Sequence, residues 1–326
     1  MGFNEIMGQD KAIELIKAGF LTGRISHAYL FFGQQGVGKF KTAQIMARLL
    51  NCESPTSDSE PCDCCVACLK AISGNHPDII VTGPDGKAIK IAQMRALQEK
   101  ANYKCYEGNY KVILIDEVEL LTAEAANSLL KVLEEPPDNT VFILSAQDTI
   151  GLPATILSRC QPVPFRPLSE NTIAEILKEQ GLQSSFPLTV AKGSVGKAMQ
   201  MLQSYDGEQL ISNITQLLMG LGEISYQEIF RWAETMEKDR DLLEVSLDVM
   251  AAIYRDRLIT GLTKDERLIL INQDFPGKAL DKAAYLKALE NIIASRQLLN
   301  GNANIRLVLE VLMIRLRNIE SERKGA

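Results

Sequence analysis

Residues 33–40 carry the glycines and the lysine of a phosphate-binding loop, followed by an unexpected phenylalanine. In such a loop, backbone N–H groups cradle phosphates, the lysine reaches the outer phosphates, and a hydroxyl after the lysine holds Mg²⁺. Phe40 stands at the hydroxyl position and cannot coordinate Mg²⁺, a cation that prefers oxygen ligands. The pattern predicts a nucleotide site on four residues that has lost one metal ligand: Gly33, Gly36, Gly38 and Lys39.

The segments on both sides of this loop are those that a phosphate loop requires. Residues 28–32 form a short apolar run typical of a strand, and residues 42–50 place apolar side chains at helical spacing. This context favours a phosphate loop over an ordinary glycine turn. Thr42 offers a hydroxyl, but it lies roughly 200° around the helix from position 40 and is a poor substitute. The sequence leaves open whether ATP or ADP binds here.

Five of the seven cysteines cluster in one polar segment, residues 52–68. Spacings of two residues between cysteines let thiolates converge on Zn²⁺ through tight turns. We therefore expect a structural zinc site with four ligands: Cys52, Cys62, Cys65 and Cys68. Cys64 lies in the same segment and could replace one of them. Metal-free buried thiols and a redox role are the alternative interpretations.

A second apolar run, residues 111–115, ends in the two carboxylates Asp116 and Glu117. In nucleotide hydrolases this end of a parallel strand lies beside the phosphate loop, where an aspartate can hold Mg²⁺. A neighbouring glutamate can orient the attacking water as a general base. The alternative is a buried strand followed by an exposed acidic turn. The phosphate loop earlier in the chain favours the first interpretation.

Composition and element order set the wider frame. The chain has 326 residues, 46% hydrophobic and 23% charged, which is typical of a globular protein with two or three domains. Strands alternate with helices in the first half, which predicts a parallel sheet covered on both faces. The formal net charge of −6 argues against a basic nucleic-acid footprint over the whole chain. No apolar leader or membrane span is evident, so we expect a cytoplasmic location without a membrane partner.

Further motifs complete a resemblance to one family. They are Gly8-Gln9, the run from Asn127 to Pro137, and Ser158-Arg159-Cys160. With the phosphate loop, the cysteine cluster and the acidic pair, they resemble bacterial DNA polymerase III clamp-loader subunits of the AAA+ class. The resemblance is specific over residues 1–168 and weaker beyond, where residues 304–310 are similar to a collar segment.

This resemblance implies an α/β RecA-like AAA+ core, a small helical lid and an all-α collar domain that builds a five-subunit ring. The expected boundaries are 1–166 for the core, with the zinc module at 52–68, then 167–206 for the lid and 207–326 for the collar. The ring uses ATP to load a sliding clamp onto primed DNA. The implied partners are gamma/tau-type and delta-type subunits, the clamp and the DNA.

The resemblance also implies roles for single residues. Lys39 would contact phosphates, Asp116 and Glu117 would take the metal and water positions, and Gln147 would take the polar sensor position. Arg159 would be an arginine finger that reaches the nucleotide of a neighbouring subunit. A guanidinium suits that task because it is always charged and offers a planar fork to phosphate oxygens.

Two types of subunit in this family could match, and two departures separate them. A gamma/tau-type motor should have a hydroxyl where this chain has Phe40. It should also have a lid arginine where this chain has Gly196, with Lys197 one residue away. Both losses favour a delta-prime-type subunit that completes the ring, lends Arg159 to a neighbour, and has weak or absent ATPase activity of its own. Enzymatic activity would then belong to the DNA polymerase III assembly.

Two competing hypotheses remain at this point. One is an active gamma/tau-type ATPase motor of the same complex. The other is a stand-alone zinc-dependent DNA-binding module, which is the weaker because the cysteine segment lacks interleaved basic and aromatic residues.

Overall fold

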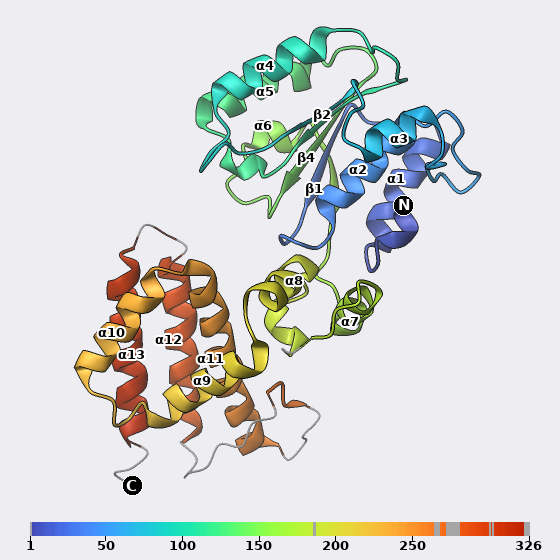
Figure 1. Ribbon diagram of the computed structural model, residues 1–326. Helices are drawn as coiled ribbons and strands as arrows, with labels where there is room; N and C mark the ends of the chain where they lie inside the picture. The colour runs from blue at the N-terminus through green and yellow to red at the C-terminus, as the bar shows by residue number, and fades with distance from the viewer. Residues whose placement is uncertain are drawn as a thin grey trace. The chain divides into compact units, whose positions relative to one another are not determined.

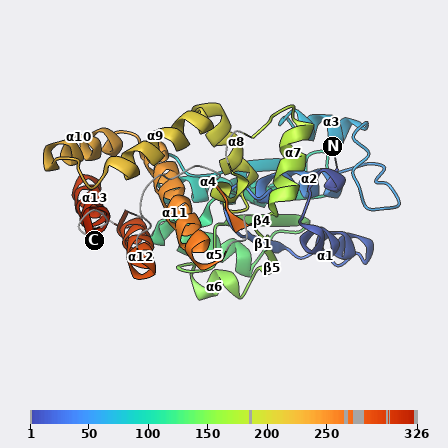
Figure 2. The same ribbon diagram turned by 90° about the horizontal axis from the view of Figure 1, so that it is seen from below.

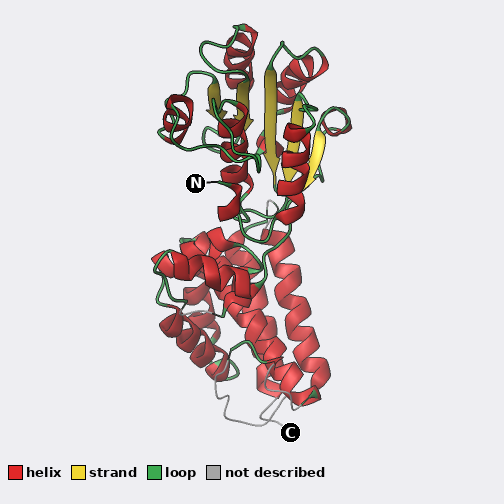
Figure 3. Cartoon of the chain, turned by 90° about the vertical axis from the view of Figure 1, so that its right-hand side faces the viewer, coloured by secondary structure: helices red, strands yellow, loops and turns green. Residues whose placement is uncertain are grey.

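The computed structural model describes residues 2–184, 187–263, 268–271, 281–299, 301 and 303–322. The chain divides into two compact units. The first comprises Met1–Glu179 and Gly193–Lys197, and the second comprises Gln180–Lys192 and Ala198–Ala326. Within the described ranges, every strand belongs to the first unit, and the second is built from helices (Figure 3).

A five-stranded parallel sheet forms the centre of the first unit. Its strands are β1 (Ala28–Phe32), β2 (Ile79–Thr82), β3 (Lys111–Ile115), β4 (Thr140–Ala146) and β5 (Gln161–Pro164). They pair in the order β2-β3-β4-β1-β5, with Leu30 beside Leu144 and Ile113 beside Phe142. Because all strands run the same way, the segments that follow β1, β3 and β4 meet at one edge of the sheet.

Alternation of side chains along the strands creates two separate apolar cores. Leu30, Ile113 and Phe142 face one core, and their neighbours Phe31 and Leu114 face the other. The first core is covered by α4 (Ile91–Asn102), α5 (Ala123–Glu134) and α6 (Ala154–Leu157), and the second by α1 (Asp10–Leu21) and α2 (Lys39–Leu50). Figure 1 shows these two groups of helices on opposite faces of the sheet.

Local signals in the sequence set the ends of α5. The side chain of Thr122 accepts a hydrogen bond from the Ala125 N–H and caps the first turn. The helix ends at Glu134, two residues before a pair of prolines that cannot continue it. The remaining elements of this unit are short: η1 (Phe3–Glu5), α3 (Val66–Ile72), η2 (Val118–Leu120) and α7 (Glu170–Glu179).

The second unit packs long helices around one apolar core. Its elements are η3 (Leu188–Ala191), α8 (Val195–Ser204), whose first residues belong to the first unit, α9 (Gly207–Gly220), α10 (Tyr226–Glu237), α11 (Arg240–Leu262), α12 (Lys282–Leu299) and α13 (Ile305–Glu322). Figures 1 and 2 show α11, α12 and α13 side by side, with Leu247, Ile292 and Leu312 in the core between them. No helix in the described ranges is long and apolar enough to cross a membrane.

The fold class predicted from the sequence is confirmed. The parallel sheet, the helices on both of its faces, the cysteine insertion and the helical second half are all present. The boundaries predicted at residues 166 and 206, which separate a lid from a collar, stay predictions.

Candidate nucleotide and metal sites

The phosphate loop lies between β1 and α2, as its sequence context predicts. The loop leaves β1 after Phe32, and α2 begins at Lys39 with Gly38 as its N-cap. Gly38 has a φ of +103°, a left-handed conformation that a residue with a Cβ rarely adopts. The first N–H groups of α2 therefore open towards the loop, which is the geometry that favours an anion.

Lys39 is turned inward onto the carbonyls of its own loop. Its Nζ donates to the Gly33 carbonyl at 2.5 Å and to the Gln34 carbonyl at 2.9 Å. The side chain is buried. Burial lowers the pKa of Lys39, and the nearby carboxylates of Asp116, Glu119 and Glu117 oppose that shift. The ammonium group of Lys39 therefore donates its hydrogen bonds to carbonyls of the loop. A bound phosphate would have to take the place of those carbonyls.

The acidic pair lies next to the loop, but its first member is already engaged. Ser145, near the end of β4, donates its hydroxyl to Asp116 Oδ1. Glu117 follows in a left-handed conformation with φ of +54°, and Gln35 of the loop donates to its carboxylate at 3.4 Å. Burial raises the pKa of Glu117, and repulsion from Asp116 and Glu119 adds to that effect. The structure therefore brings the loop and both carboxylates together.

Neither Thr42, the possible substitute for the missing hydroxyl, nor Gln147, the expected sensor residue, donates a hydrogen bond to the phosphate loop from its side chain in the described ranges, apart from the bond of Thr42 to Gly38. Thr42 Oγ1 donates to the Gly38 carbonyl within α2 at 2.8 Å and is fully buried. Its hydroxyl is therefore committed to the helix backbone. Gln147 is exposed just after β4, where its N–H donates to Glu119 Oε1 at 3.0 Å. The sensor role of Gln147 stays a prediction.

A glycine segment lies directly against the phosphate loop. The N–H of Gly196 donates to the carbonyl of Gly36 at 3.1 Å. A Cβ on Gly196 would come within 2.9 Å of Gly36 Cα, which is closer than such atoms pack. Both residues belong to the first unit. The position where the resemblance implies a lid arginine therefore has no room for a side chain in this arrangement.

Arg159 lies just after α6 and is held by neighbouring groups. Its Nη2 donates to Glu134 Oε1 at 2.6 Å, and its Nη1 donates to the Thr155 carbonyl at 3.0 Å. The side chain is one-third exposed, at 33%. Its hydrogen bonds in the described ranges join it to α5 and α6. The guanidinium is accordingly pre-positioned by a carboxylate at the end of α5 and remains open to solvent on one side.

The four predicted cysteine ligands converge. The sulfurs of Cys52, Cys62, Cys65 and Cys68 all lie within 4.8 Å of one another. The sulfurs of Cys62 and Cys68 are 3.9 Å apart, close to the roughly 3.8 Å that a tetrahedral ion with metal–sulfur bonds of about 2.3 Å requires. Cys64 is exposed and outside this group. The donor set therefore fits a tetrahedral metal ion held by four thiolates.

Backbone N–H groups already point at these sulfurs. The N–H of Cys65 donates to Cys62 Sγ, and the N–H of Cys68 donates to Cys65 Sγ, each at 3.4 Å. N–H groups from Cys64 and Cys65 lower the pKa of Cys62 to about 6, because they stabilise its thiolate. Two ion pairs, Arg48–Asp63 at 3.0 Å and Lys17–Glu60 at 2.5 Å, attach the segment to α2 and α1.

Three participants were not identified from the sequence. Ser145 contacts Asp116, Gln35 contacts Glu117, and Glu134 holds Arg159. Glu134 lies within the run that carried the family resemblance. The sequence does not show, however, that the fold brings Glu134 into contact with Arg159. Ser145 and Gln35 are ordinary polar residues. They reach the acidic pair only because β3, β4 and β1 lie side by side in the sheet, and the sequence does not reveal that strand order.

The strand order and the site define the class of protein. A phosphate loop after β1, two carboxylates after β3, and the order β2-β3-β4-β1-β5 make the first unit a nucleotide-binding-type domain of the AAA+ class.

Comparisons with known proteins identify the family. The family described as "DNA polymerase III, delta subunit" matches residues 8–169. DNA polymerase III subunit delta' of Bacillus subtilis is 31% identical over 95% of this chain and 96% of its own length. The tau/gamma subunit of Haemophilus influenzae is 30% identical over 96% of this chain, which spans 49% of that protein. A gamma subunit-related protein of Thermotoga maritima aligns structurally with a TM-score of 0.48 at 15% identity, over 95% of this chain and 100% of its own.

The chain belongs to the DNA polymerase III clamp-loader subunit family. The resemblance found in the sequence is thereby confirmed.

Replacing Gly36 with alanine tests the contact between the loop and Gly196. The new methyl group would clash with Ser194 Oγ and lie 2.9 Å from Gly196 Cα, at a φ of +75°. Gly23→Ala is the matched control, because Gly23 has a φ of +65° and nothing within 4 Å. We expect Gly23→Ala to lower the free energy of unfolding by about 1 kcal/mol. Gly36→Ala should lower it by about 2 kcal/mol more, measured by urea denaturation. Equal losses would show that the contact is absent.

Removing one thiol tests the metal site. Cys65→Ser should leave a bound ion with three thiolates, so metal content measured by mass spectrometry should fall well below about one ion per chain. Cys64→Ser provides the control and should retain the metal, because Cys64 lies outside the cluster. A Cys64→Ser protein that loses the metal as completely as Cys65→Ser would contradict this assignment of ligands.

Proposed function

We propose that this chain is a delta-prime-type subunit of a DNA polymerase III clamp loader. In this role it completes the ring beside gamma/tau-type and delta-type subunits, and the assembly loads a sliding clamp onto primed DNA in the cytoplasm. The observation that carries the proposal is the match to a delta' subunit along nearly the full length of both chains. A motor of the gamma/tau type is less well supported, because Phe40 and Gly196 stand where such a motor should have a hydroxyl and an arginine.

In this proposal, the nucleotide site of this chain hydrolyses ATP slowly or not at all. Phe40 supplies no metal ligand, Lys39 is bonded to its own loop, and Asp116 is bonded to Ser145. Gly196 leaves no place for a lid arginine. ATP or ADP would have to displace the lysine's hydrogen bonds to the Gly33 and Gln34 carbonyls before gaining that lysine as a partner. Nucleotide binding, where it occurs, should therefore be weak.

Arg159 acts as the arginine finger of a neighbouring subunit. Its guanidinium is partly exposed, fully charged and held by Glu134 at 2.6 Å. In the ring, the phosphates of the neighbour's nucleotide compete with Glu134 for the same fork of N–H donors. Phosphate carries more negative charge than one carboxylate and can accept two hydrogen bonds from the guanidinium at once. Both properties favour replacement of Glu134 by the phosphate. In the free subunit, Glu134 thus holds the guanidinium beside the end of α5.

The four cysteines hold Zn²⁺ in a structural role. A set of four thiolates at tetrahedral spacing is typical of structural zinc, with no position left open for a catalytic water. The ion would hold the segment of residues 52–68 together, where only Cys52, Ser59, Glu60, Pro61 and Cys68 are buried.

Substitution of Arg159 in a complex reconstituted with gamma/tau-type and delta-type subunits tests the proposed role. Arg159→Ala should reduce turnover at the neighbouring ATP site by about 10³-fold or more, as arginine fingers do in other phosphoryl-transfer proteins. Arg159→Lys should restore little, since a lysine lacks the planar fork. The readout is the rate of ATP hydrolysis by the complex, with gel filtration to confirm assembly.

Glu134→Ala is the matched control for this experiment. It removes the partner of Arg159 in the free subunit and leaves the guanidinium in place, so the complex should retain its ATPase activity. An Arg159→Ala complex that assembles and hydrolyses ATP at the unmodified rate would overturn the finger assignment.

A further inference from the structure

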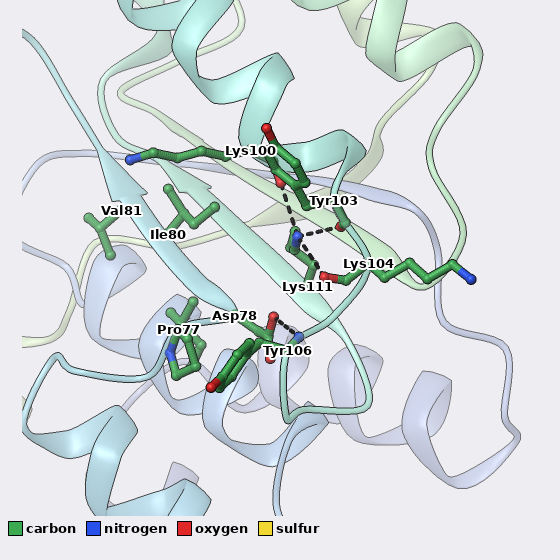
Figure 4. A pocket seen from close by; sticks show the side chains of 10 residues that line it. Pro77, Asp78, Ile80, Val81, Lys100, Tyr103, Lys104, Tyr106 and Lys111 are labelled. Carbon is green, nitrogen blue, oxygen red and sulfur yellow. Dashed lines mark hydrogen bonds between the residues drawn. The ribbon is translucent and has the colours of Figure 1, made fainter.

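A groove of about 700 Å³ lies beside β2, and no residue of the phosphate loop or the cysteine cluster lines it (Figure 4). The end of α4, the loop after it and strand β2 form its walls. Its lining residues are Pro77, Asp78, Ile79, Ile80, Val81, Lys100, Tyr103, Lys104, Tyr106 and Lys111. The proposed function uses none of them.

Strand β2 ends the sheet on this side and offers unpaired backbone groups. The carbonyls of Asp78 and Thr82 accept hydrogen bonds from the strand β3 side, at 2.8 and 2.9 Å. Because backbone direction alternates along a strand, the N–H and C=O of Val81 point away from β3. In the described ranges no further strand pairs with β2 on that side. An edge of this kind is a template for another strand.

The loop beside this edge is rigidly held, although its side chains are exposed. The buried Lys111 donates to the carbonyls of Lys100, Tyr103 and Lys104. The carboxylate of Asp78 accepts the N–H groups of residues 106, 107 and 108 at 2.7, 2.9 and 2.8 Å. These contacts fix residues 103–108 at both ends. A surface that is ordered before binding loses less conformational entropy when a partner arrives.

Two tyrosines project from that fixed loop. Tyr103 is 72% exposed and Tyr106 is 84% exposed, while Val81 on the strand is 52% exposed. Tyrosine supplies a large contact area with few rotatable bonds and is enriched at protein interfaces. Together with Ile80 and Pro77, the rings give the groove apolar surface beside its unpaired backbone groups (Figure 4).

The groove favours a negatively charged partner. Lys100 and Lys104 are exposed; the side chain of Lys100 extends over Ile80 towards Val81, whereas that of Lys104 points the opposite way (Figure 4). The lining carboxylate, Asp78, is occupied by three N–H groups, and the nearby Glu107 is paired with Lys70 at 2.6 Å. Two exposed lysines are few for a nucleic acid, whose binding depends on many phosphate contacts. A peptide strand, in contrast, would use the outward N–H and C=O of Val81.

We propose that the outer edge of β2 binds an extended peptide segment that carries carboxylates and adds to the sheet as a sixth strand. Its backbone would pair with Val81, a carboxylate would meet Lys100, and its apolar side chains would pack on Tyr103 and Tyr106. This mode of recognition takes its affinity from main-chain hydrogen bonds and its selectivity from the flanking side chains. It does not depend on the proposed function of Arg159.

Binding assays on the full chain test the proposal with three fluorescein-labelled probes. They are an alternating Glu-Val peptide of about eight residues, the Lys-Val peptide of equal length, and oligodeoxythymidine. We expect the Glu-Val peptide to bind and to protect the Val81 amide from hydrogen exchange. Lys100→Glu should weaken that binding about tenfold and should favour the Lys-Val peptide instead. Lys178→Glu, an exposed lysine on α7, is the matched charge control and should bind as the unmodified chain does.

A backbone variant separates strand addition from simple charge attraction. Val81→Pro removes the outward N–H and should weaken the Glu-Val peptide while the fold persists, because proline is tolerated on edge strands. Hydrogen exchange at Val81 in the unmodified chain gives the same test if that variant fails to fold.

Three outcomes would overturn the proposal. One is failure of the Glu-Val peptide to bind. Another is binding without protection of the Val81 amide. The third is binding of oligodeoxythymidine in preference to the peptide, which would make the groove a nucleic-acid surface.

Discussion

The contact between the phosphate loop and the segment around Gly196 constrains the nucleotide site. Gly196 donates to the Gly36 carbonyl, and neither glycine has room for a Cβ in this arrangement. In the same loop, Lys39 donates to the carbonyls of Gly33 and Gln34. This packing therefore requires a residue without a side chain at position 196. A lid arginine could not stand there without a change in the packing.

Arg159, which follows α6, differs from Lys39 in its exposure. Lys39 is buried, whereas Arg159 is partly exposed and paired with Glu134. The phosphate loop follows β1, which lies between β4 and β5 in the sheet, while Arg159 precedes the edge strand β5. The difference in exposure is consistent with the proposal that the chain contributes Arg159 to another site while its own lysine stays engaged.

Much of this arrangement could be predicted from the sequence, and the reasons are local. The phosphate loop needs fixed glycine spacing, the cysteine cluster needs short steps between thiols, and α5 is bounded by Thr122 and a proline pair. Contacts that depend on tertiary packing could not be predicted. Examples are Ser145 on Asp116, Glu134 on Arg159, and the close approach of Gly36 to Gly196. The groove along β2 also depends on which strand lies at the edge of the sheet. The hydrophobic runs in the sequence predict strands but do not reveal the order of the strands in the sheet.

The rate of ATP hydrolysis by the isolated chain tests the central claim most directly. It should be measured at steady state with Mg²⁺, beside the Lys39→Ala variant as the background. A closed loop without a hydroxyl ligand predicts the same low rate for both proteins, because Lys39 contributes no catalysis. Robust turnover that Lys39→Ala abolishes would show that the loop opens, binds Mg²⁺ and nucleotide, and drives hydrolysis. That result would contradict the account and favour a motor subunit.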